Sequence, residues 1–147
     1  MNKKYTRIIV VVIVCILAVN VIRAFMFLGN ANTFNAAGIK IATNKFKSAK
    51  EVEVHNNGST IQINVILDKE AKSLTTDNYV EIRDFFAKLN TMDNTDSEIY
   101  VVSLDIRNSA DSGICGGAVL TTDIFNTDWG KITDIKELAN NLDLVIY

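Results

Sequence analysis

An uninterrupted apolar run opens the chain, before any alternating pattern begins. Every residue from 8 to 28 is apolar except Asn20 and Arg23. At a rise of about 1.5 Å per residue, a helix of this length spans roughly 30 Å, the thickness of the hydrocarbon core of a bilayer. A helix on the surface of a globular protein would carry a polar stripe, and none precedes Asn20. The pattern therefore predicts an N-terminal transmembrane helix over residues 8–28.

The charges before the apolar run predict on which side of the membrane the rest of the chain lies. Residues 1–7 are basic and contain no acidic side chain. Basic flanks remain in the cytoplasm, so the C-terminal part is expected outside it, as in a single-pass protein of the cell membrane. A secretory signal that is cleaved near Ala31 is the alternative, because residues 29–31 are small. The apolar run extends past Arg23, which favours a retained anchor.

Alternating apolar and polar residues predict a β-hairpin early in the next part of the chain. Residues 29–38 are mostly small and polar and predict a linker, followed by one extracytoplasmic domain at 39–147. Apolar and polar side chains alternate over 51–55 and again over 61–67. Asn57-Gly58, between them, suits the two central positions of a type I′ turn. We expect a hairpin with one buried face.

Two helices and three further strands complete the predicted domain. Asn78 with Glu81, and Asp134 with Glu137, have the spacing of helix capping boxes, and apolar stripes follow both. The further strands are expected at residues 99–107, 114–121 and 144–147, the first of them buried on both faces. The order β-β-α-β-β-α-β predicts an α+β domain, a mostly antiparallel sheet with two helices packed on one face.

The domain is acidic, which limits the partners it can bind. All seventeen Asp and Glu residues lie beyond residue 50, whereas every charged side chain in the first thirty residues is basic. A surface of this charge repels phosphate backbones and gains nothing from counterion release. Nucleic acid is therefore excluded as the expected partner, and a protein partner outside the membrane is expected instead.

Cys115 is the only residue of the domain that suggests covalent chemistry. A cysteine nucleophile needs a base, and His55 is the only histidine in the chain. The alternation places His55 on the solvated side of the hairpin, and no local signature surrounds Cys115. A small surface hydrolase or redox protein that uses Cys115 is therefore the alternative function. The ordinary interpretation of Cys115 is a small buried apolar residue.

Glycines and the single tryptophan are the candidate binding residues. Gly113, Gly116 and Gly117 precede a strand and lack the lysine and helix of a phosphate-binding loop, so a bulge in an edge strand is expected there. If a partner's backbone approaches the domain, these glycines offer the closest contact. Trp129 is either an anchor over the core or an exposed recognition residue. No pattern for a metal ion or a cofactor is present, and none is expected.

These patterns together favour a binding protein over an enzyme. The predicted function is that of a membrane-anchored protein that presents a small acidic binding or assembly domain outside the cytoplasm. An envelope complex, a secretion system or an immunity device would each use such a module.

Overall fold

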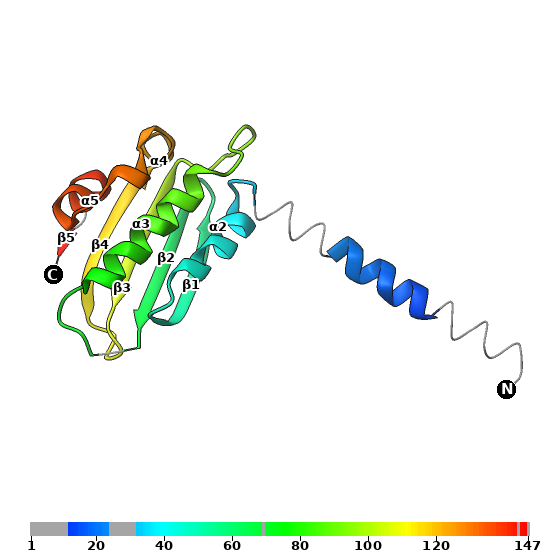
Figure 1. The fold of residues 1–147 in the computed structure, drawn as a ribbon, viewed down its shortest axis with the longest axis horizontal. Helices are drawn as coiled ribbons and strands as arrows, with labels where there is room; N and C mark the ends of the chain where they lie inside the picture. The colour runs from blue at the N-terminus through cyan, green and yellow to red at the C-terminus, as the bar shows by residue number, and fades with distance from the viewer. Residues whose placement is uncertain (1–11, 24–31, 69, 144, 147) are drawn as a thin grey trace, which may run out of the picture.

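A mixed α+β domain follows a short N-terminal helix. The computed structural model describes residues 12–23, 32–68, 70–143 and 145–146. After the helix at residues 12–23, the elements are α2 (Ala36–Ala42), the 3₁₀ turn η1 (Thr43–Lys45), β1 (Ala49–Asn57), β2 (Thr60–Leu67), α3 (Thr76–Asn90), β3 (Val101–Arg107), β4 (Gly113–Leu120), α4 (Thr121–Asn126), the 3₁₀ turn η2 (Trp129–Lys131), α5 (Ile135–Leu142) and β5 (Val145–Ile146). Figure 1 shows α3 lying along the middle of the sheet.

The five strands form one sheet in sequence order, β1-β2-β3-β4-β5. The pairs β1–β2, β3–β4 and β4–β5 are antiparallel, whereas β2 and β3 are parallel. The prediction of a mostly antiparallel sheet is therefore wrong at its centre, and the sheet is mixed. The reason is α3, which carries the chain back along the sheet so that β3 begins at the same end as β2.

The hydrophobic core lies between the sheet and the helices. Alternate side chains of β2 and β3 are buried, and α3 contributes several more. The buried side chains of these three elements are Ile61, Ile63, Val65 and Leu67 in β2, Val102, Leu104 and Ile106 in β3, and Ile82, Phe85, Phe86 and Leu89 in α3. Phe85 and Phe86 pack edge to face with centroids 5.0 Å apart. Burial of this one face stabilises the sheet, because apolar area removed from water contributes about 25 cal/mol per Å².

The hairpin is present, but its register differs from the prediction. Asn57 pairs with Thr60, so the two-residue loop is Gly58-Ser59 and not Asn57-Gly58. Gly58 has a φ of 71°, and no positive φ is found at Ser59. A positive φ at the first central position alone defines a type II′ turn, in which glycine is favoured there.

Both predicted helices form, with one change at a cap. Asp134 caps α5, and its Oδ1 accepts a hydrogen bond from the amide of Glu137 at 2.8 Å. Thr75 caps α3, where Asn78 was expected to do so. The Asn78 side chain is the reciprocal partner in this capping box, since its Oδ1 accepts from the amide of Thr75 at 2.9 Å.

The sheet carries two helices that the sequence did not predict. The first is α2, whose cap Asn35 accepts a hydrogen bond from the amide of Gly38 at 2.9 Å. The second is α4, which follows β4 without a loop. Phe34, in the expected linker at 29–38, is fully buried. The folded domain therefore begins before Ile39.

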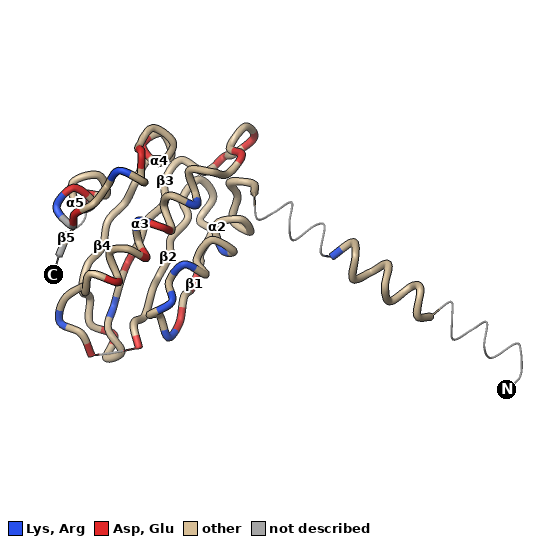
Figure 2. Tube along the Cα trace, in the orientation of Figure 1, with Lys and Arg blue, Asp and Glu red and all other residues tan. Residues whose placement is uncertain are grey.

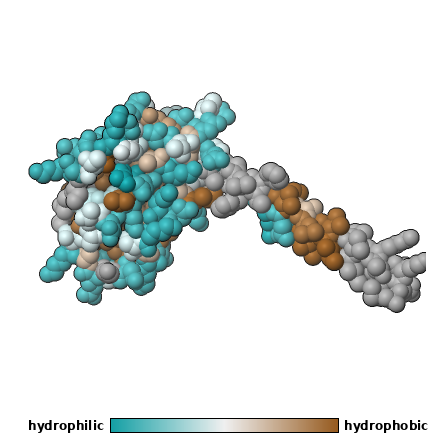
Figure 3. Space-filling view, viewed as in Figure 1, coloured by the Kyte–Doolittle hydropathy of each residue, from teal (hydrophilic) through white to brown (hydrophobic). Residues whose placement is uncertain are grey.

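The predicted transmembrane helix is not found. Within the residues that the structure describes, no helix has both the length and the apolar character that crossing a bilayer requires. The helix at residues 12–23 occupies the middle of the predicted span and is mostly hydrophobic in Figure 3. The basic segment 1–7, both ends of the span and the cleavage site near Ala31 lie outside the described residues.

Strand β1 forms an edge of the sheet. It pairs with β2 on one side, and no other described strand lies beside it. Its side chains are mostly exposed. Lys50, Glu51 and Glu53 follow one another closely along this edge.

Candidate binding face

The second face of the sheet is not covered by any described helix. The helices pack on the face that carries the core, and polar side chains alternate with the core residues on the other. We call this second face the open face. It consists of Glu51, Glu53, His55, Gln62, Asn64, Ile66, Ser103, Asp105, Arg107, Gly113, Gly116 and Ala118. The residues come from four adjacent strands and form rows across them, such as His55, Gln62, Ser103 and Ala118.

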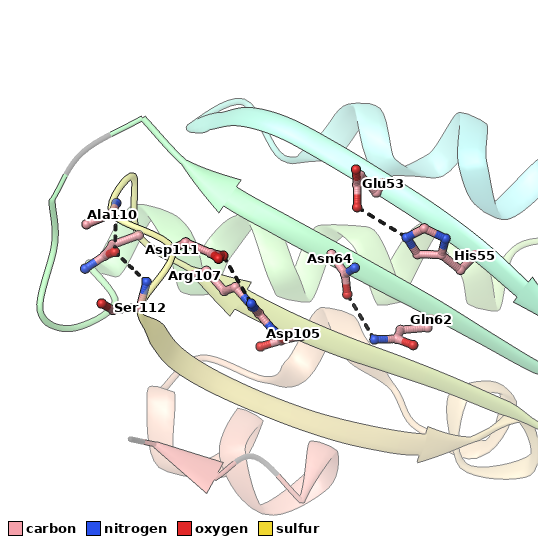
Figure 4. A network of polar contacts seen from close by, with 10 residues as sticks. Glu53, His55, Gln62, Asn64, Asp105, Arg107, Ala110, Asp111 and Ser112 are labelled. Atoms are coloured by element: carbon pink, nitrogen blue, oxygen red, sulfur yellow. Dashed lines mark hydrogen bonds and ion pairs between the residues drawn. The ribbon is translucent and has the colours of Figure 1, made fainter.

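Polar contacts along β1, β2 and β3 link side chains of the open face (Figure 4). The His55 Nε2 lies 3.2 Å from Glu53 Oε2. On the next strand, Gln62 Nε2 donates to Asn64 Oδ1 at 3.1 Å. These partners are two residues apart on one strand, where side chains share a face. Each of these contacts therefore links two neighbouring side chains of the open face.

Arg107 forms the most strongly paired cluster of this face. Its Nε and Nη2 both donate to Asp105 Oδ2 at 2.9 Å, and its Nη1 donates to Asp111 Oδ1 at 3.1 Å. The hydrogen bonds with Asp105 and Asp111 raise the pKa of the Arg107 guanidinium. Together with Gly113, these three residues line a hollow of about 450 Å³.

The turn that presents Asp111 is fixed by its own hydrogen bonds. Asn108 Oδ1 accepts from the amides of Ala110 and Ser112, each at 3.0 Å. Asp111 has a φ of 60°, in the left-handed region that few residues other than glycine adopt. This backbone conformation positions the Asp111 carboxylate beside Arg107.

The open face is acidic. Glu51, Glu53, Asp105 and Asp111 carry four carboxylates at this face and its rim, against the single guanidinium of Arg107. Figure 2 shows acidic and basic positions interspersed over the whole domain. The excess of carboxylates on the open face agrees with the excess of acidic residues in the domain as a whole. In the described part of the chain, no group of three His, Cys, Asp or Glu residues could hold a metal ion.

The three candidate glycines lie on both sides of β4. Gly113 is opposite Arg107, and Gly116 is opposite Asp105, which places both on the open face. Gly117 is opposite Leu104, on the side of the helices. The predicted bulge is present as a shift of register between Ile106 and Arg107, but β4 is not the edge strand, because β5 pairs with it. A role in binding stays a prediction for these glycines.

Trp129 lies in the core. Its side chain is 2% exposed, and its ring stacks on Phe86 with centroids 5.0 Å apart and 21° between the planes. The indole N–H donates to the carbonyl oxygen of Ile124 at 2.7 Å. This arrangement is that of an anchor over the core, and it leaves almost no indole surface for a partner.

The structure does not bring Cys115 and His55 together. Cys115 is opposite Ile106 and is fully buried under the helices, whereas His55 lies on the open face. Burial, with a smaller contribution from the charge of Asp105, raises the pKa of the Cys115 thiol to about 12. A thiol with this pKa is protonated at neutral pH and is a poor nucleophile.

The thiol of Cys115 is therefore expected to resist alkylation in the folded protein. Iodoacetamide at pH 8 should modify Cys115 only after unfolding, which mass spectrometry of digested protein can measure. Because its pKa is raised from 9.0 to about 12 in the folded state, Cys115 should also lower the free energy of unfolding as the pH rises through that range. Cys115→Ala should remove this loss. Rapid modification of the folded protein at pH 8 would contradict the buried geometry.

Sequence reasoning missed three residues of the open face, although a signal for them was present. Ser103, Asp105 and Arg107 each alternate with buried apolar residues of β3. Strand 99–107 was expected to be buried on both faces, because residues that favour strands occur on both of them. The regular polar residue at every second position was the sign of an exposed face.

Comparisons with protein-family models, with curated proteins and with solved structures found no match for this chain.

Proposed function

We propose that the domain is a protein-binding module held at a membrane through residues 8–28, and that the open face is its binding surface. One observation carries the proposal: the three adjacent strands β1, β2 and β3 present rows of polar side chains, several of them paired with one another, on a face that no described helix covers. Most sheets of small domains with one uncovered face expose it to solvent or to a partner. The side chains of the open face already contact one another, and this favours exposure of the face to a partner.

The charge of the open face indicates the chemistry of the partner. Four carboxylates against one guanidinium attract a basic surface and repel an anionic one. The partner is therefore a protein with exposed Lys and Arg side chains opposite the strands. The same charge opposes binding of nucleic acid by this domain.

The apolar N-terminal segment supports attachment to a membrane. Residues 8–28 are almost wholly apolar and follow a basic segment, a combination that retains a chain at the bilayer with its C-terminal part outside the cytoplasm. Secretion after cleavage near Ala31 is the alternative outcome.

Crosslinking at the open face tests the binding proposal. A photo-crosslinking amino acid at Gln62 of the whole chain, in cells that produce it, should form a discrete adduct with a protein. Ser103, directly beside Gln62 in the same row, then reports on charge. Ser103→Lys should reduce the yield of the adduct about tenfold, because a like charge faces the basic partner, and Ser103→Glu should leave it or increase it.

The control places the same crosslinker at Thr122, an exposed position of α4. No adduct of the same mass is expected there. Equal adducts at Gln62 and Thr122, or a stronger adduct with Ser103→Lys, would refute the proposal. Fractionation of cells tests the attachment: a C-terminal tag should follow the membranes and be cut by external protease, whereas tagged protein in the medium that begins near Asn32 would establish secretion.

A further inference from the structure

A second hollow lies outside the open face, where β2 ends and α3 begins. Its volume is about 450 Å³, and its walls come from the turn before β1 and the start of that strand, from the end of β2 and the loop after it, and from the first turn of α3. Ligand pockets in proteins commonly measure about 300–1,000 Å³. None of the residues that line it belongs to the open face.

A hydrogen-bond network gives this hollow a fixed wall. Asn78 is 6% exposed, and its Nδ2 donates to Ser48 Oγ at 2.8 Å. Ser48 is bound in turn to the carboxylate of Glu81, through its hydroxyl and through its amide at 2.9 Å. Thr75 completes the network at Asn78 Oδ1. These bonds join the turn that precedes β1 to α3 and link Ser48 with Asn78, which both line the hollow.

Charged side chains of both signs line the same hollow. They are Lys47 and Lys50 on the side of β1, with Asp68 after β2 and Asp77 in α3. No ion pair joins any of the four to another residue that the structure describes. Two cationic and two anionic groups are therefore available to a bound molecule.

We propose that this hollow binds a small zwitterion, a free α-amino acid or a dipeptide. An anion alone would gain from Lys47 and Lys50 but would also lie beside two carboxylates. A cation alone would meet the opposite conflict, whereas a molecule with one carboxylate and one ammonium satisfies both sets. The volume is within the range of pockets that bind small molecules of this size.

Binding to the hollow can be measured by NMR, through the signals of the backbone amides of Ser48 and Asn78. The whole chain, labelled with ¹⁵N and held in detergent, is titrated with each of the twenty free L-amino acids and with L-alanyl-L-alanine. At least one of these, at about 10 mM or below, should shift both amide signals. Its N-acetylated and amidated forms, which each lack one charge, should bind about tenfold more weakly or not at all. Shifts with an amino acid but not with the dipeptide identify the free amino acid as the ligand, and the reverse result identifies the peptide.

Two substitutions and two matched controls complete the test. Asp68→Asn and Lys50→Gln should each weaken binding of the active zwitterion about tenfold. Asp96→Asn and Lys136→Gln remove the same charges at exposed positions outside the hollow and should leave affinity unchanged. An unchanged amide spectrum elsewhere confirms that each variant is folded. The proposal is overturned if no amino acid or dipeptide shifts the two amides, if a singly charged form binds equally well, or if the controls weaken binding as much.

Discussion

A chain that begins at Asn32 should fold, and a chain that begins at Ile39 should be less stable by about 4–6 kcal/mol. Phe34 is fully buried and packs edge to face on Phe125 with centroids 5.1 Å apart. Loss of a buried phenylalanine costs about 3–5 kcal/mol, and loss of the cap at Asn35 costs about 1 kcal/mol more. The total stability of a domain of this size is about 5–15 kcal/mol. Far-ultraviolet circular dichroism during urea unfolding measures both fragments.

Phe34→Ala in the longer fragment separates the side chain from the rest of the deletion. It should lower the free energy of unfolding by about 3–5 kcal/mol. Ala37→Ser, at an exposed position of α2, is the control and should change stability by less than about 0.5 kcal/mol. Equal urea midpoints for the chains that begin at Asn32 and Ile39 would show that the residues before Ile39 are not part of the domain.

Trp129→Ala should destabilise the same fragment by about 3–5 kcal/mol, because it leaves a large cavity beside Phe86 and removes the donor to Ile124. Trp129→Phe should cost less, since it keeps the stacked ring and loses the hydrogen bond. Tyr100→Ala is the control, because the Tyr100 side chain is 67% exposed. Urea unfolding monitored by circular dichroism measures all three. A loss below about 1 kcal/mol for Trp129→Ala would contradict its place in the core.

The pattern of the hairpin predicts its faces but not its register. With Asn57-Gly58 as the loop, Val54 would pair with Ile61, whereas with Gly58-Ser59 as the loop it pairs with Ile63. The two registers differ by two residues, so the same side chains face the core in both. Hydrophobic alternation cannot distinguish them, and the choice depends on which turn fits the twist of the strands.

The missed helices and the parallel pair have different physical causes. Helix α2 is short and contains Gly38, so its intrinsic helix propensity is low and its burial against the sheet stabilises it. Helix α4 begins directly after β4, with no side-chain cap to mark its start. The parallel pairing of β2 with β3 depends on long-range packing of α3, which no local pattern records.

The candidate site could be predicted only in part from the sequence. Gly113 is exposed on the open face, whereas Gly116 faces the same side but is buried, so a role of either in binding stays a prediction. Trp129 was selected because it is the only tryptophan, and single occurrence says nothing about exposure. The small hollow at Ser48 and Asn78 joins residues thirty positions apart, a proximity that only the folded chain creates.

The charged side chains on the edge of β1 protect the molecule from its own copies. Two such edges meeting in antiparallel order about their midpoints would set Glu53 of one copy against Glu53 of the other. Like charges placed directly opposite one another destabilise such a pair. Uncovered edge strands are sites of aggregation, and charges along them are a common defence. Replacement of these acids by threonine would leave the fold intact and make concentrated protein prone to sheet-to-sheet assembly.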